Sequence, residues 1–176
     1  MFIRNFVIAL ALLSLISCKE ISFKEAQPKG KKGLARVPEK LCGNYAIQND
    51  EGKTEDTLFV TAQGYKLGHN PNDAALLSDS LVLKFYKGYY FLSINKRPEW
   101  FLRVIQPEKN GDMAYLVLEQ QDGSFSDYLE RVSFEVEIDS TSSTTEKLYQ
   151  IDPTPKQLLD LIQKGFFKKT ILKKIR

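Results

Sequence analysis

The chain has few of the residues that catalysis and metal binding most often need. It contains two cysteines, one histidine and one tryptophan among its 176 residues. A zinc site takes three or four protein ligands, and a Ser-His-Asp arrangement here would have to use His69. No Gly-x-Ser-x-Gly motif accompanies that histidine. The sequence therefore offers no catalytic residue, no metal site and no cofactor, and we expect a protein that is not an enzyme.

Charge of one sign and long apolar runs are also scarce. The formal net charge of +3 is too small to indicate a nucleic-acid partner. The most sustained apolar run, residues 6–13, is too short to cross a bilayer as a helix. Because Arg4 lies just before it, the run is typical of the apolar core of a signal peptide.

The four residues Leu15-Ile16-Ser17-Cys18 follow that run and resemble the bacterial lipobox. The resemblance implies that residues 1–17 are a lipoprotein signal peptide, and that acylated Cys18 anchors the chain in a lipid bilayer. Each buried methylene of an acyl chain adds about 0.8 kcal/mol of membrane affinity, so several chains hold a protein firmly. Lys19, instead of the Asp that retains lipoproteins at the inner membrane, favours the outer membrane, facing either the periplasm or the cell surface. An uncleaved anchor or an ordinary secretory signal is the alternative.

The segment that follows, residues 18–40, is expected to be a flexible tether. It contains two prolines and two glycines, and residues 19–40 hold seven Lys or Arg against three Glu. A flexible segment of this length has a reach of about 25 Å. Its basic residues are either solvated or attracted to anionic headgroups.

The rest, residues 41–176, is expected to form a single mainly β domain. Its short apolar runs alternate with turn residues, which predicts an antiparallel meander sheet or small barrel of about seven to nine strands. Residues 154–157, Thr-Pro-Lys-Gln, predict the start of one late helix over about 155–164. Residues 74–77 allow one helical turn. The sequence predicts strands over 43–48, 56–61, 80–86, 89–95, 100–106, 113–119 and 128–138, and residues 65–67 and 147–151 allow two more. Residues 166–175 form either a second helix or, as favoured, a final strand over 170–175.

Two of these strands, residues 89–94 and 100–105, are apolar on nearly both faces, so we expect both to be covered on each side. The strand at 128–138 instead alternates apolar and polar residues and should have one face in solvent. Cys42, left alone once Cys18 is acylated, is either a buried small apolar residue or a reactive thiol.

Gly43-Asn44-Tyr45, at the start of the first predicted strand, resembles the Gly-x-Trp motif of the lipocalin or calycin family. Tyr45 stands where that family has tryptophan, and the family's later motifs are missing. The resemblance implies a β-barrel that carries a small apolar ligand, and it transfers no ligand-binding residue to this chain.

Aromatic residues gather in the middle of the chain and are the best candidates for a ligand or partner site. Tyrosine and tryptophan combine apolar area with a polar tip, which suits recognition as well as core packing. Packing in the core is the alternative for each of them. The candidates are Tyr86, Tyr89, Tyr90, Trp100 and Tyr115.

Three tripeptides resemble the Asp-Ser/Thr acceptor of periplasmic O-glycosylation. They predict Thr57, Ser80 and Ser140 as acceptors, with Ser140 favoured because its Ser/Thr-rich loop is expected to be exposed. The alternative is that aspartate precedes these residues because it suits turns.

The sequence leaves two functions open for an envelope lipoprotein. The first is a non-enzymatic binding or assembly module for an envelope protein partner, and the second is a calycin-like carrier of a small apolar ligand. A cavity of roughly a few hundred Å³ would favour the carrier, whereas a filled core with an exposed aromatic patch would favour the assembly module.

Overall fold

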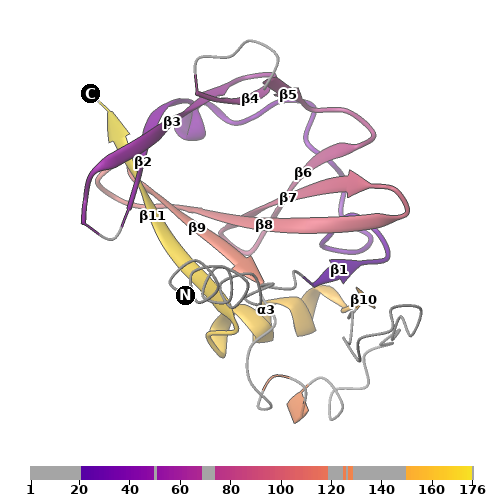
Figure 1. The fold of residues 1–176 in the computed structure, drawn as a ribbon. Coiled ribbons are helices and arrows are strands. Elements are labelled where there is room, and N and C mark those ends of the chain that lie inside the picture. Colours follow the sequence, from indigo (N-terminus) through magenta and orange to yellow (C-terminus); the bar gives the residue numbers. More distant parts are fainter. Residues whose placement is uncertain are drawn as a thin grey trace, which may run out of the picture.

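The computed structural model describes residues 21–49, 51–68, 74–118, 125, 127–128 and 150–175, and these form a mainly β structure with one helix late in the chain (Figure 1). The strands are β1 (Ser22–Phe23), β2 (Gly43–Gln48), β3 (Thr54–Thr61), β4 (Gly64–Leu67), β5 (Ala74–Leu76), β6 (Leu81–Tyr86), β7 (Tyr89–Lys96), β8 (Glu99–Pro107), β9 (Met113–Leu118), β10 (Gln150–Ile151) and β11 (Phe167–Ile175). The helical segments are the 3₁₀ turn η1 (Glu39–Leu41) and the helix α3 (Pro155–Gln163). The predicted fold class is confirmed.

Two antiparallel meanders make up most of the sheet. Strands β2 to β5 pair in chain order, and so do β6 to β9. The last strand, β11, joins the meanders because it pairs with β9 through residues 167–172 and with β2 through residues 173–175. β1 pairs with the start of β8, next to the part of β8 that pairs with β9, and β10 pairs with β1 in parallel. The C-terminal strand therefore holds the sheet together.

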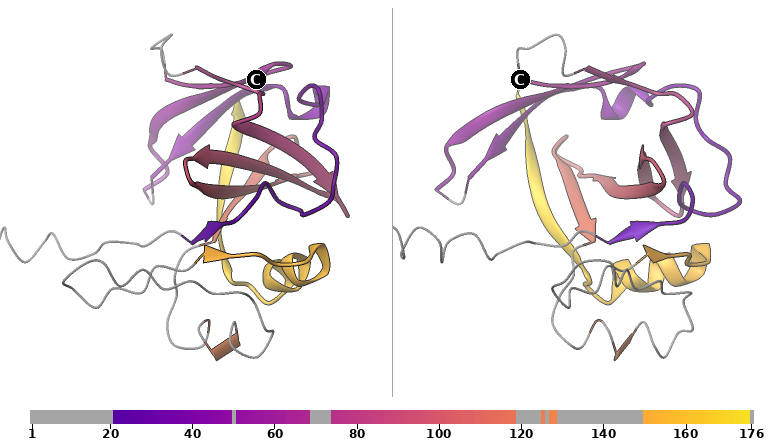
Figure 2. Two further views of the ribbon diagram at one scale, coloured as in Figure 1. Left: turned by 90° about the vertical axis from the view of Figure 1, so that its right-hand side faces the viewer. Right: turned by 45° about the vertical axis from the view of Figure 1, so that its right-hand side comes forward.

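The sheet is strongly curved but not closed. In Figure 2, β2 to β5 arch over β6 to β9, and β11 runs from the level of α3 to the upper layer. Within the described residues, β5 and β6, at the two ends of the curved part, do not pair with each other. The sheet is therefore open between β5 and β6.

The hairpin β6–β7 forms as its sequence predicts. Lys87 and Gly88 both have positive φ, 49° and 89°, as a type I′ two-residue turn requires. Residues 74–76, for which a helical turn was one expectation, instead form strand β5 against β4. The predicted strand at 128–138 lies almost entirely outside the described residues.

Each of the two faces of the central strands is covered by its own apolar cluster. In β8, Leu102 and Val104 face the cluster that contains α3, whereas Arg103 and Ile105 point to the other face. β7 behaves in the same way, with Phe91 on the helix side and Leu92 on the opposite side. The expectation that both strands are covered on each side is confirmed.

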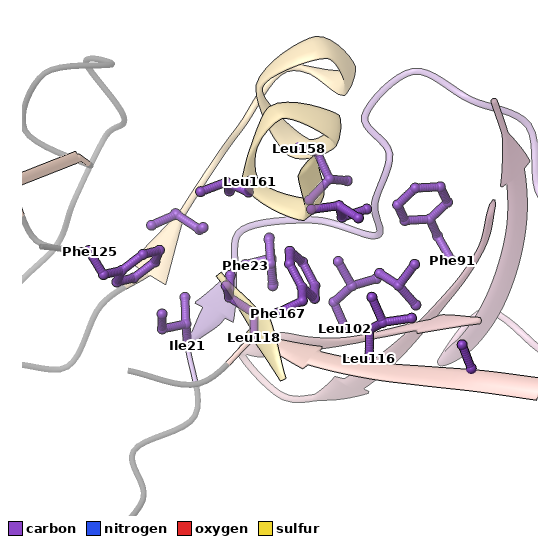
Figure 3. Packing of buried hydrophobic residues seen from close by; sticks show 14 residues of the cluster. Ile21, Phe23, Phe91, Leu102, Leu116, Leu118, Phe125, Leu158, Leu161 and Phe167 are labelled. Atoms are coloured by element: carbon purple, nitrogen blue, oxygen red, sulfur yellow. The ribbon is translucent and has the colours of Figure 1, made fainter. Parts of the chain in front are cut away.

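Helix α3 begins where the sequence predicts. The Thr154 hydroxyl accepts a hydrogen bond from the Gln157 backbone N–H, and the Gln157 side chain accepts one from the Thr154 N–H at 2.9 Å. The helix inserts Leu158 and Leu161 into the cluster around Phe23 and Phe167 (Figure 3). Burying each leucine stabilises the fold by about 1.5–3 kcal/mol, so packing is what fixes the helix on the sheet.

The expectation of a flexible tether is wrong for residues 21–40, because this segment packs against the sheet. Ile21 and Phe23 are each 1% exposed and belong to the same cluster as α3. Further along, Gln27 is fully buried, and its backbone N–H donates to the Ser93 hydroxyl at 2.9 Å. The Lys84 ammonium donates to the carbonyl of Ala26 at 2.6 Å. These contacts join residues that lie far apart in the sequence, so local composition did not reveal them.

The same segment then passes round the free edge of β6. Gly33 forms an isolated antiparallel β-bridge with Lys84, and the Leu34 N–H donates a hydrogen bond to the Leu83 carbonyl at 2.7 Å. A few residues later the Val37 N–H donates to the Ala62 carbonyl at 2.9 Å, in the turn between β3 and β4. The N-terminal segment therefore links the two meanders across the gap between β5 and β6.

Candidate functional site

A cavity of about 480 Å³ lies on the concave face of the sheet, on the side away from α3. Its wall includes residues from β2, β3, β4, β6, β7, β8, β9 and β11 together with the N-terminal segment. The lining residues are Val37, Leu41, Ile47, Leu58, Val60, Gly64, Tyr65, Leu67, Leu77, Leu83, Leu92, Ile94, Arg103, Ile105, Met113, Tyr115, Thr170 and Leu172. Both the volume and the apolar lining are typical of a site for a small molecule.

The N-terminal segment contributes directly to this cavity. Val37 and Leu41 line it and are almost completely buried. Leu41 is held in place because its carbonyl accepts a hydrogen bond from the buried Tyr45 hydroxyl at 3.2 Å. Tyr45 in turn lies under the ammonium of Lys174, 5.6 Å from the ring centroid. Because Val37 belongs to the stretch that the sequence assigned to a tether, part of that stretch forms the cavity wall.

One opening of the cavity is marked by Leu67 of β4, which lines it and is 40% exposed. Leu76 of the neighbouring edge strand β5 is more exposed still. The backbones of β4 and β5 approach so closely here that a Cβ on Gly64 would lie 2.0 Å from the Ala75 carbonyl oxygen. Glycine at this position therefore lets β5 pair closely with β4, the strand that carries Tyr65 and Leu67 of the cavity wall.

Few polar side chains line the cavity, and Arg103 is the one charged side chain among the lining residues described. Its guanidinium donates to the Leu102 carbonyl at 3.0 Å. Burial raises the pKa of the Tyr65 hydroxyl, and the nearby positive charge of Arg103 acts in the opposite direction. Tyr115 and Thr170 add two further hydroxyl groups. A ligand bound here would contact mainly apolar side chains and one positively charged group, the guanidinium of Arg103.

The structure does not bring the five predicted aromatic residues into one site. Tyr86, Tyr89 and Trp100 pack against the cluster that contains α3, on the far side of the sheet from the cavity. Tyr90 belongs to the core on the cavity side without lining the cavity, and its ring lies 4.8 Å from that of Phe85. Of the five, only Tyr115 lines the cavity.

The remaining predicted sites are placed in part. Ser80 is exposed in the turn before β6, and its hydroxyl lies 3.1 Å from that of Ser78. Thr57 is half-buried within β3, paired with Ala46. Cys42 is a free, half-buried thiol. Cys18, His69 and Ser140 lie outside the described residues.

Sequence reasoning missed Arg103, although a signal for it was present. It is the one charged residue in a stretch, residues 100–105, that is otherwise apolar on both faces. Such a charge indicates a position that differs from the apolar core around it, and in the structure Arg103 lines the cavity.

No group of three potential metal-ligating side chains lies together in the described part of the chain. No helix among those residues is long and apolar enough to cross a membrane. No family model matches the chain, and neither the curated proteins nor the solved structures contain a significant match.

Proposed function

We propose that this chain is a membrane-anchored envelope lipoprotein whose β domain binds a small apolar ligand. The observation that supports the proposal most is the cavity of about 480 Å³ with its largely aliphatic lining. A core that serves only to stabilise a fold is normally packed without spaces of this size. Of the two functions that the sequence leaves open, the cavity favours the carrier over an assembly module for a protein partner.

The anchor in this proposal is acylated Cys18, at the outer membrane as Lys19 favours. Because Ile21 is already buried in the domain, only two residues, Lys19 and Glu20, separate the anchor from the folded core. The three residue-to-residue steps from Cys18 to Ile21 span at most about 10 Å when fully extended. The domain would therefore sit directly on the bilayer surface, where apolar molecules are available, and not at the end of a 25 Å tether.

Binding of N-phenyl-1-naphthylamine, an uncharged apolar fluorophore, tests the proposal on the Cys18→Ser chain, which needs no detergent. We expect saturable binding with enhanced emission. Ile105→Trp should weaken it at least about tenfold, because the larger side chain projects between Tyr90 and Tyr115 into the cavity. The matched control is Phe85→Trp, at a position 46% exposed and outside the cavity lining.

Two results would overturn this function. One is the absence of saturable binding by a folded Cys18→Ser chain, and the other is equal binding by Ile105→Trp and Phe85→Trp. Native mass spectrometry of the same chain adds an independent readout. A small extra mass that Ile105→Trp loses supports the carrier, whereas a protein-sized partner retained by both variants supports the assembly module.

A further inference from the structure

Aromatic rings and a lysine lie together on the surface at the tip of the β6–β7 hairpin. The tip presents Phe85, which is 46% exposed, and Lys87, which is exposed in the two-residue turn. Tyr86, just before that turn, is half-buried. No acidic residue occurs among residues 85–90. The hairpin therefore combines apolar, aromatic area with positive charge.

The N-terminal segment adds two lysines to the same surface. It runs along the outside of the sheet from β1 to η1 and passes β6 on the way (Figure 2). The Lys31 ammonium lies 4.7 Å from the centre of the Tyr86 ring, and the Lys40 ammonium lies 5.9 Å from that of Phe85. Because a cation is attracted to the face of an aromatic ring, these contacts keep both lysines beside the hairpin. Together these side chains form a basic aromatic patch that consists of Lys31, Lys40, Phe85, Tyr86 and Lys87.

The positive charge of the basic aromatic patch is not balanced by acidic neighbours. Residues 31–40 hold four Lys or Arg against one Glu, and the hairpin adds a further lysine. Lys31, Lys40 and Lys87 are all exposed, and none of them forms an ion pair with another residue of the described part of the chain. Surfaces that bind a bilayer peripherally have this composition, because aromatic rings enter the headgroup region while ammonium groups are attracted to anionic lipid. Charge and composition therefore both fit an anionic bilayer.

The lipid anchor proposed at Cys18 brings this patch to a bilayer. The segment that carries Lys31 and Lys40 belongs to the domain from Ile21, which is at most about 10 Å from Cys18. Anchoring keeps the local concentration of lipid high, so even weak contacts of the patch contribute to binding. The same segment crosses the open side of the sheet and places Val37 in the cavity wall. A domain that lies on this patch therefore turns the open side of its sheet toward the bilayer.

We propose that the basic aromatic patch is the surface with which the domain lies on an anionic bilayer, with its two rings in the headgroup region and its three lysines on lipid phosphates. This inference rests on the membrane anchor of the proposed function and adds the orientation of the domain. It also explains why lysines of the N-terminal segment are held over aromatic rings at the surface.

Flotation with lipid vesicles tests the inference on residues 18–176 carrying Cys18→Ser, which lack both the acyl chains and the apolar signal peptide. All contacts of the described fold are kept, because they begin at Ile21. We expect this chain to bind vesicles of equal parts phosphatidylcholine and phosphatidylglycerol at least about tenfold more tightly than vesicles of phosphatidylcholine alone. Raising sodium chloride from about 0.1 to about 1 M should weaken this binding, because it shortens the Debye length from about 10 to about 3 Å.

Substitutions in the patch locate the binding surface. Lys31→Glu and Lys87→Glu should each weaken binding to the anionic vesicles at least about fivefold, because each lysine near an anionic surface contributes about that factor. Phe85→Ser should weaken it as well, since less apolar area enters the headgroup region. The matched control is Lys53→Glu, the same charge change at an exposed lysine between β2 and β3, and it should keep the binding within about twofold. Urea unfolding of each variant confirms that it is folded.

The outcomes separate the two proposals. The inference is wrong if the folded chain does not bind anionic vesicles, if it binds both kinds of vesicle equally, or if Lys53→Glu weakens binding as much as Lys87→Glu. An acidic protein that is retained through Lys87, without vesicle binding, would instead assign the patch to a protein partner. In each of these cases, saturable binding of N-phenyl-1-naphthylamine in the absence of lipid keeps the carrier function. If the patch binds vesicles but the fluorophore does not bind, the carrier function fails and the membrane surface stands.

Discussion

Replacing Phe23 by alanine is the sharpest test of whether the N-terminal segment belongs to the folded domain. Phe23 is 1% exposed, pairs with Trp100 through strand β1, and lies in the cluster beneath α3 (Figure 3). In a flexible tether this substitution would change the free energy of unfolding by no more than about 0.5 kcal/mol. The structure predicts a far larger effect.

The magnitude follows from the burial. Removing a fully buried phenylalanine ring loses its transfer free energy and leaves a cavity, which together cost about 3–5 kcal/mol. For a chain of this size, each kcal/mol lowers Tm by about 2–4 °C. Phe23→Ala should therefore lower Tm by about 6–20 °C. Phe85→Ala, at a position 46% exposed, loses mainly its ring contact with Tyr90 and should cost about 0.5–1.5 kcal/mol.

The assay is urea unfolding followed by far-ultraviolet circular dichroism, with thermal unfolding as a second measurement. Both are performed on the Cys18→Ser chain and on its Phe23→Ala and Phe85→Ala variants. If Phe23→Ala were no more destabilising than Phe85→Ala, residues 21–40 would not be part of the cooperative unit.

Three further substitutions test separate parts of the structure. The pKa of Asp112, which is 8% exposed, is lowered first by a hydrogen bond from the Lys174 backbone N–H and then by one from the Lys173 ammonium. The ionised carboxylate therefore stabilises the fold above its ordinary pKa of 3.8. This stability is lost as the pH falls from 3.8 through the lower pKa of the folded state. The excess urea stability of wild type over Asp112→Asn should therefore shrink below pH 3.8, and a pH-independent difference would contradict this. Thr154→Ala removes the helix cap and should cost about 1 kcal/mol in urea unfolding, whereas no loss would mean that the cap is redundant. Gly64→Ala places a Cβ against the Ala75 carbonyl, so it should lower the free energy of unfolding by about 1–3 kcal/mol and weaken fluorophore binding. Unchanged binding would show that β5 is not needed for the cavity.

Much of the local structure could be predicted from the sequence because it depends on neighbouring residues. The hairpin turn at Lys87 and Gly88 follows from the positive φ that glycine allows, and α3 starts where Thr154 and Gln157 cap it. The hydrophobic patterns likewise predicted the strands β6 to β9 and the two covered faces of β7 and β8. Hydrogen bonds within a few residues and a repeat of two along a strand are sufficient for these predictions.

The candidate site could be predicted much less well. Tyr89 and Tyr90 are adjacent in sequence, yet they face opposite sides of the sheet, so a concentration of aromatic residues in the chain did not become one in space. Arg103 could be noticed as a charge in an apolar strand, but which surface it faces depends on the pairing of β8 with β7 and β9. Sequence spacing gives the side of a strand on which a residue lies, and not what covers that side.

The sequence by itself determined the β-rich class, the turns, the late helix and the prediction of a lipid anchor at Cys18, because each depends on a short continuous pattern. Only the tertiary structure decided that residues 21–40 are part of the domain. Hydrogen bonds from Leu34 to Leu83 and from Val37 to Ala62 hold this segment across the open side of the sheet. It also decided that a cavity lies behind that segment with Arg103 in its wall. The physical reason is that these features arise from contacts between strands far apart in the chain, whose formation depends on the curvature and pairing of the whole sheet.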